Sequence, residues 1–142
     1  MQESQPKTIS VLSIITTDEE EETLRGMLTH CRWQLTFVRT WQSAIAQLRL
    51  RHFDVVTGDC CLPNGHSWRE LLRELQMFSD PPPLVVTSRI ADQRLWAEVL
   101  SLGGFDLLVK PLDEKEANHV LRQAAQFRRS DALLACQAGP AA

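Results

Sequence analysis

Short apolar segments alternate with longer amphipathic segments along most of this chain. Each of the five short segments is rich in Val, Ile, Leu or Thr and is bounded by polar or turn-forming residues. Such segments are typical of buried strands, and their largely continuous apolar character favours a parallel sheet covered on both faces. The predicted strands are residues 9–15, 33–38, 53–59, 84–88 and 107–110.

The longer segments place apolar residues three and four positions apart, which is the spacing of a helix with one buried face. The predicted helices are residues 18–31, 43–52, 67–75, 92–102 and 113–129. For the first helix, Asp18 is the predicted N-cap and Glu21 its capping-box acid. Ser67 and Glu70 have the matching roles in the third helix.

The fourth helix is expected to pack closely on the sheet. Its Leu95, Val99 and Leu100 are predicted to face inward, and Gly103-Gly104 predicts its C-terminal cap. Trp96 is interpreted as a core residue because tryptophan side chains are mostly buried, whereas an exposed Trp96 would indicate a partner surface.

Five strands alternating with five helices predict an α/β fold: a doubly wound, five-stranded parallel sheet with helices on both faces. A length of 142 residues fits one domain. We place a single domain at residues 1–129 and interpret residues 130–142 as a tail or linker. The periodicity alone does not give the order of the strands.

Composition and charge exclude several classes of function. A hydrophobic content of 44% with 23% charged residues is ordinary for a globular protein. No apolar run approaches the length of a membrane span, and no cationic and apolar leader is evident, so we expect a cytoplasmic protein without membrane contact. A formal net charge of -3 argues against direct binding of nucleic acid.

Polar side chains stand at the ends of three predicted strands. Asp59 ends the third strand, Ser88 the fourth and Lys110 the fifth. Open α/β sheets bind ligands at the carboxyl ends of their strands, so these three groups are expected to converge. A carboxylate nucleophile, a hydroxyl donor and a fixed cation are the groups needed to accept a phosphoryl group on an aspartate.

Together these residues make the chain resemble the response-regulator receiver family of two-component signalling. The matching pieces are Asp59 followed by Leu62-Pro63, Ser88 after its strand, Gly103-Gly104 before the last strand, and Lys110-Pro111. They span roughly residues 8 to 128 in the right order and spacing, so the joint signal is far more specific than any one piece.

The resemblance implies a flavodoxin-like strand order, 2-1-3-4-5. It also implies that Asp59 is the phosphoacceptor, that Ser88 and Lys110 bind the acyl phosphate, and that the Lys110-Pro111 bond is cis. The implied partners are a histidine kinase or phosphotransfer protein and an output domain or regulator. The implied signalling face comprises residues 92–102, 107–110 and 113–129, and no enzymatic activity is expected.

Two positions depart from the family pattern. Thr16-Thr17 stands where receivers carry an acidic pair that, with the phosphoacceptor, holds Mg²⁺, and Leu107 stands where they carry a switch aromatic. Asp18 is the remaining candidate metal ligand beside Asp59, so Mg²⁺ binding is expected to be weak. Arg89, next to Ser88, is either a second cation near the site or an exposed loop residue.

These departures leave a degenerate, phosphorylation-independent interaction module as the main alternative. A phosphatase of the haloacid dehalogenase type is disfavoured because Cys61 occupies the position of its second acid. The four cysteines are expected to be reduced. A zinc site from Cys60, Cys61 and His66 is disfavoured because their spacing matches no common pattern.

Overall fold

A computed structural model describes residues 8–28, 33–90 and 92–138, and for residues 128–138 it describes the backbone alone. The strands are β1 (Ile9–Ile14), β2 (Trp33–Val38), β3 (Val55–Asp59), β4 (Leu84–Ser88) and β5 (Asp106–Val109). The helices are α1 (Asp18–Met27), α2 (Trp41–Leu50), α3 (Trp68–Gln76), α4 (Gln93–Leu102) and α5 (Glu114–Ala138), with a 3-10 turn at Pro63–Gly65.

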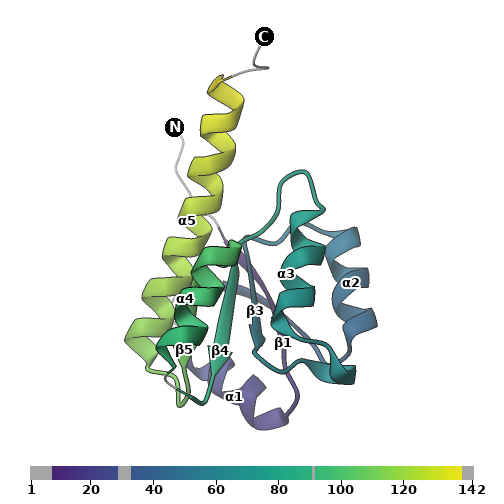
Figure 1. Cartoon of the computed structure of the whole chain (residues 1–142), viewed down its shortest axis with the longest axis vertical. Helices are drawn as coiled ribbons and strands as arrows, with labels where there is room; N and C mark the ends of the chain where they lie inside the picture. The colour runs from purple at the N-terminus through teal and green to yellow at the C-terminus, as the bar shows by residue number, and fades with distance from the viewer. Residues whose placement is uncertain (1–7, 29–32, 91, 139–142) are drawn as a thin grey trace.

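The strands form one parallel sheet in the order β2-β1-β3-β4-β5, which confirms both the doubly wound fold and the predicted order (Figure 1). Successive side chains of a strand point to opposite faces. In the central strand β3, Val55 and Val56 therefore enter separate apolar clusters, and both are fully buried.

Each apolar cluster joins one face of the sheet to a different set of helices. The first includes Leu48 of α2, Leu71 of α3 and Val99 of α4. The second includes Leu121 of α5, with Met27 of α1 packed against it. Helices thus cover both faces, as predicted, and the loops at the carboxyl ends of the strands remain free to form a site.

Helix α1 begins differently from the prediction. Its N-cap is Thr17, whose side chain accepts a hydrogen bond from the Glu20 amide, while the Glu20 carboxylate accepts one from the Thr17 amide. The assignment of Asp18 and Glu21 to these roles was wrong by one residue, because a run of acids offers several carboxylates at capping distance. The box predicted at Ser67 and Glu70 is confirmed.

Helix α4 is less buried than predicted. Val99 is fully buried and Leu95 partly so, but Leu100 and Trp96 are exposed, Trp96 to 48%. The indole Nε1 donates to the Asp106 carboxylate at 3.2 Å, so a polar partner at the start of β5 holds the ring on the surface. The interpretation of Trp96 as core was therefore wrong.

The remaining boundaries follow local chemistry. Gly103 caps α4 at a φ of 110°, as predicted, where a residue with a Cβ would be strained. The Lys110-Pro111 bond is cis. Helix α5 continues to Ala138, past the predicted end at residue 129, and projects beyond the sheet (Figure 1). No helix among the described residues is long and apolar enough to span a membrane.

Candidate functional site

The site lies where three neighbouring parallel strands end. Asp59 of β3 pairs in register with Thr87, and Ser88 of β4 pairs with Val109. The Lys110 amide continues this ladder by donating to the Ser88 carbonyl at 2.7 Å. These strand ends therefore share one edge of the sheet, where the Asp59 carboxylate and the Lys110 amine meet.

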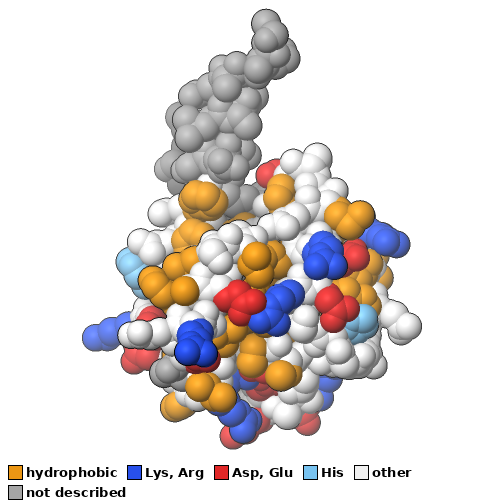
Figure 2. Space-filling view, viewed as in Figure 1, with side chains coloured by type: hydrophobic (Ala, Val, Ile, Leu, Met, Phe, Trp, Pro, Cys, Tyr) orange, Lys and Arg blue, Asp and Glu red, His pale blue; other side chains and the backbone are white. Residues whose placement is uncertain are grey.

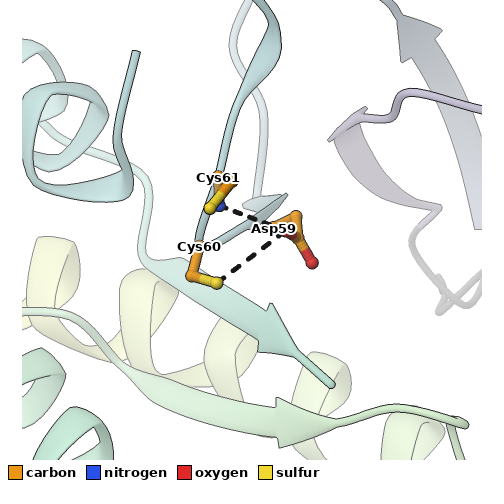
Figure 3. Close-up of side chains that lie close together, drawn as sticks. All are labelled: Asp59, Cys60 and Cys61. Carbon is orange, nitrogen blue, oxygen red and sulfur yellow. Dashed lines mark hydrogen bonds between the residues drawn. The ribbon is translucent and has the colours of Figure 1, made fainter. Parts of the chain in front are cut away.

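The two carboxylate oxygens of Asp59 have different neighbours. Oδ1 lies 2.9 Å from Lys110 Nζ. Oδ2 accepts a hydrogen bond from the Cys61 amide at 3.1 Å and lies 3.8 Å from Cys60 Sγ (Figure 3). One side of the carboxylate thus faces a cation and the other faces two thiols.

Lys110 is shared between two carboxylates. Its Nζ lies 2.5 Å from Glu20 Oε2 and 2.9 Å from Asp59 Oδ1, and its side chain is only 17% exposed. Burial alone would lower the pKa of Lys110, but the hydrogen bonds to Glu20 and Asp59 outweigh it and raise the pKa above its ordinary value. The ammonium is therefore a permanent charge at this edge.

Glu20 is a site residue that the sequence reasoning missed. Its Oε1 accepts hydrogen bonds from the Thr16 amide at 2.7 Å, the Thr16 hydroxyl at 2.9 Å and the Thr17 amide at 3.2 Å. Burial alone would raise the pKa of Glu20, but the hydrogen bonds from Lys110 and Thr16 lower it to about 2. The pattern Thr17-x-x-Glu20 was the sequence signal that could have found it.

Ser88 is almost fully buried at the end of β4. Its Oγ accepts a hydrogen bond from the Ile90 amide at 3.1 Å and lies 3.9 Å from Cys60 Sγ. The backbone contact fixes the hydroxyl at the end of β4. Because side chains alternate along a strand, Thr87, in register with Asp59, is the β4 residue that lines the cavity beside Lys110.

Two further sequence candidates, Asp18 and Arg89, lie in different places relative to Lys110. Asp18 pairs with Arg39, and its side chain is 86% exposed, so its carboxylate is not among the groups gathered around Lys110. Arg89 is exposed and lines a cavity of about 390 Å³ that adjoins Lys110 and Glu20. No ion pair within the described ranges involves Arg89.

The residues present do not fit an oxygen-liganded Mg²⁺ ion. Such a site needs carboxylate oxygens free to coordinate the ion. Here Asp59 and Glu20 each give an oxygen to Lys110 Nζ, so the ammonium stands where a cation would have to bind both. Thr16 and Thr17 supply no charge in place of the missing acids.

His66 does not join the cysteines that follow Asp59. Its ring stacks on Trp41 at a centroid distance of 4.0 Å, and its Nδ1 lies 3.0 Å from Glu70 Oε2. The cluster of potential ligands that the described residues do form consists of Asp59, Cys60 and Cys61.

Comparison with known proteins identifies the family to which this chain belongs. The profile of the response regulator receiver domain family matches residues 13–122. The chain therefore belongs to that family, which confirms the resemblance drawn from the sequence.

One related protein agrees with this assignment. The chain is 27% identical over 105 residues to the regulatory protein AtoC of Escherichia coli (strain K12), covering 74% of this chain and 21% of that protein. It thus spans about a fifth of that relative's length.

Two solved structures share the fold. The signal receiver domain of an HD domain-containing protein from Pseudomonas fluorescens Pf-5 has a TM-score of 0.79 at 23% identity, covering 92% of this chain and 96% of that one. The receiver domain of a putative Luxo repressor protein from Vibrio parahaemolyticus has a TM-score of 0.81 at 15% identity, with coverages of 90% and 98%.

Proposed function

We propose that this receiver domain accepts a phosphoryl group on Asp59 from the phosphohistidine of a histidine kinase or phosphotransfer protein. The observation that carries the proposal is the 2.9 Å contact between Asp59 Oδ1, at the end of β3, and Lys110 Nζ, just after β5. A carboxylate held beside a fixed ammonium can attack phosphorus while the ammonium neutralises the phosphoryl oxygens.

The proposed transfer requires one exchange of bonds. The Asp59 carboxylate forms a P–O bond, the P–N bond to the donor histidine breaks, and the ring nitrogen keeps the electron pair. Lys110 Nζ pairs with the phosphoryl oxygens, and a hydroxyl at the end of β4 donates to one of them: Thr87, in register with Asp59 and lining the cavity beside Lys110, is better placed for this than the predicted Ser88. The domain acts as an acceptor in this scheme and not as an enzyme on a separate substrate.

Glu20 sets the main barrier to this reaction. To bind phosphoryl oxygens, Lys110 must loosen its 2.5 Å contact with the Glu20 carboxylate. We therefore expect acceptance to be slow, and Mg²⁺ binding to be weak because the ion would compete with the same ammonium.

The same contact supports a second candidate, a phosphorylation-independent interaction module. Because Lys110 pairs with both Glu20 and Asp59, each carboxylate has a cationic partner in the resting domain without a bound metal ion. Leu107 in β5 is buried and carries no polar group that could report phosphorylation. Comparing partner binding by the native protein and by Asp59→Asn would separate the two candidates.

For either candidate, we propose the face formed by α4, β5 and α5 as the output surface. Trp96, Leu102 and Phe127 are exposed there, at 48%, 47% and 57%. Figure 2 shows apolar side chains interspersed with charged ones on the surface that carries α4. We propose that the domain meets its kinase and its output regulator in the cytoplasm.

Incubation of the full chain with a small phosphodonor, followed by intact mass analysis, tests the proposal. We expect a mass gain of one phosphoryl group in the native protein and in Asp80→Asn, an exposed acid far along the chain from the site. The gain should be absent in Asp59→Asn. Labelling that persists in Asp59→Asn, or a native protein that is never labelled, would contradict the proposal.

A further inference from the structure

We propose that Asp59, Cys60 and Cys61 form a binding site for a thiophilic divalent cation, for which Zn²⁺ is the probe. One carboxylate oxygen and the two Sγ atoms all lie within 4.8 Å of one another (Figure 3). Zinc bonds of about 2.3 Å to sulfur and about 2.1 Å to oxygen hold tetrahedral ligands roughly 3.5 to 3.8 Å apart. Cys60 Sγ and Asp59 Oδ2 are already 3.8 Å apart.

The orientation of the Asp59 carboxylate makes this site compatible with the resting domain. Oδ1 contacts Lys110, whereas Oδ2 faces the thiols. A cation bound on the Oδ2 side does not have to displace the ammonium, in contrast to Mg²⁺ bound between Asp59 and Glu20. The unused lone pair of Oδ2 can bind the cation while the Cys61 amide keeps its hydrogen bond.

The donor set also determines which cation binds. Two thiolates and one carboxylate favour zinc-like ions over Mg²⁺ and Ca²⁺, which prefer oxygen. Three protein ligands leave a fourth tetrahedral position for water. Cys61 is exposed and Cys60 is half-buried, so the site opens to solvent, and Ser88 Oγ lies close enough to Cys60 Sγ to orient it.

Binding of Zn²⁺ would regulate the domain at Asp59, the proposed phosphoacceptor. A cation on Oδ2 withdraws electron density from the carboxylate and blocks access to it, so Zn²⁺ should inhibit phosphorylation. That consequence rests on the proposed function, whereas cation binding itself does not. A direct binding measurement and a phosphorylation assay therefore succeed or fail separately.

Calorimetric titration of the reduced full chain with Zn²⁺ is the test. We expect one ion to bind per chain, and titration with Cd²⁺ to produce the ultraviolet charge-transfer absorption of cadmium-thiolate bonds. The matched control is Cys31→Ser/Cys136→Ser, which removes the other two cysteines of the sequence and should leave both results unchanged. Loss of binding in this control would overturn the proposal.

Substitution of each ligand should weaken binding to a different extent. We expect Cys60→Ser and Cys61→Ser each to weaken Zn²⁺ binding by more than about 100-fold, because loss of an outer-shell partner alone costs about 10- to 100-fold. Asp59→Asn should weaken it by about tenfold or more. Circular dichroism should show native-like spectra for all three. Native affinity in any of the three variants, or a native chain that binds no Zn²⁺, would overturn the site.

Discussion

The balance of charge around Lys110 controls the chemistry of this domain at the scale of single residues. One ammonium contacts two carboxylates, so the sheet edge carries a local excess of negative charge. A phosphoryl group on Asp59 would add to that excess. The site would then have to release Glu20 or recruit another cation, for which exposed Arg89 beside the adjoining cavity is suitably placed.

Sequence reasoning found two of these residues because a topological rule places them. Asp59 and Lys110 stand at the carboxyl ends of β3 and β5, parallel strands of one sheet, so their meeting follows from the fold, whereas the Ser88 hydroxyl lies against Cys60. Glu20 follows from no such rule. It is one of four successive glutamates, and only the exact start of α1 decides which carboxylate points at Lys110.

The lowered pKa of Glu20 predicts a pH-dependent contribution to stability. The folded-state pKa of about 2 lies below the ordinary 4.5, so the contribution is complete above about pH 4.5 and is lost as pH falls toward 2. We expect Glu20→Gln to reduce the free energy of unfolding by about 1 kcal/mol at pH 7, less than the full pKa shift implies because the group is partly solvated.

Urea denaturation at pH 7 and pH 3 measures this effect. Glutamine can still make the capping box, so the substitution removes the charge and keeps the cap. Glu22→Gln, at an exposed position of the same helix, is the control and should change stability little at either pH. A loss at pH 3 as large as that at pH 7 would show that the carboxylate charge is not responsible.

The same substitution should accelerate phosphorylation. With Glu20→Gln, Lys110 loses its competing charged partner and can pair with phosphoryl oxygens at lower cost. We expect the initial rate of labelling by a small phosphodonor to rise several-fold, with Glu22→Gln unchanged. A slower rate in Glu20→Gln would instead assign the Glu20 carboxylate a direct role in the reaction.

At the scale of elements, the predicted helices differ from the observed ones mainly where surface chemistry competes with periodicity. Helix α2 begins at Trp41 with Thr40 as its cap, two residues before the predicted start. In α4 the general tendency of tryptophan to be buried placed Trp96 in the core, but a carboxylate on β5 holds the indole outside. Such a polar contact between distant residues leaves no trace in a local pattern.

Helix α3 shows the opposite case, in which periodicity predicts packing correctly. Leu71, Leu72 and Leu75 have the spacing of one apolar helix face, and all three are buried in the cluster that joins α3 to the sheet. Leu71→Ala should reduce the free energy of unfolding by about 2 to 5 kcal/mol, because truncation removes buried apolar surface and leaves a cavity. Leu50→Ala, at a leucine that is 76% exposed, should change stability by less than about 0.5 kcal/mol.

Denaturant midpoints measured for both leucine variants test that contrast. The expected gap between them depends only on burial, since the two substitutions remove the same atoms. Equal losses in Leu71→Ala and Leu50→Ala would mean that α3 does not pack on the sheet in solution as the structure shows.

At the scale of the whole molecule, the proposed phosphoacceptor and the proposed output face belong to one continuous unit. β3 carries Asp59 and pairs with β4, which pairs with β5, and β5 contacts α4 through the bond between Asp106 and Trp96. The fold was predictable because alternating strands and helices allow few topologies. The length of α5 was not predictable, because its last part extends beyond the sheet (Figure 1), and an apolar stripe is required only where a helix packs on the sheet.

The connection from Asp59 to the output face predicts a change in tryptophan fluorescence on phosphorylation. Trp96 is half-exposed and its Nε1 is held by Asp106 at 3.2 Å, so a shift of α4 relative to β5 would change the solvation of the indole. We expect the emission of the native protein to change when a small phosphodonor is added, and the change to disappear in Trp96→Phe.

Trp33→Phe is the matched control, because Trp33 begins the edge strand β2 at the other side of the sheet. Since the Nε1 of Trp33 is buried and has no hydrogen-bond partner among the residues that the structure describes, replacing this ring with Phe should leave the domain folded. A fluorescence change that survives in Trp96→Phe, in protein shown by mass to be phosphorylated, would place the response elsewhere than the α4 and β5 contact.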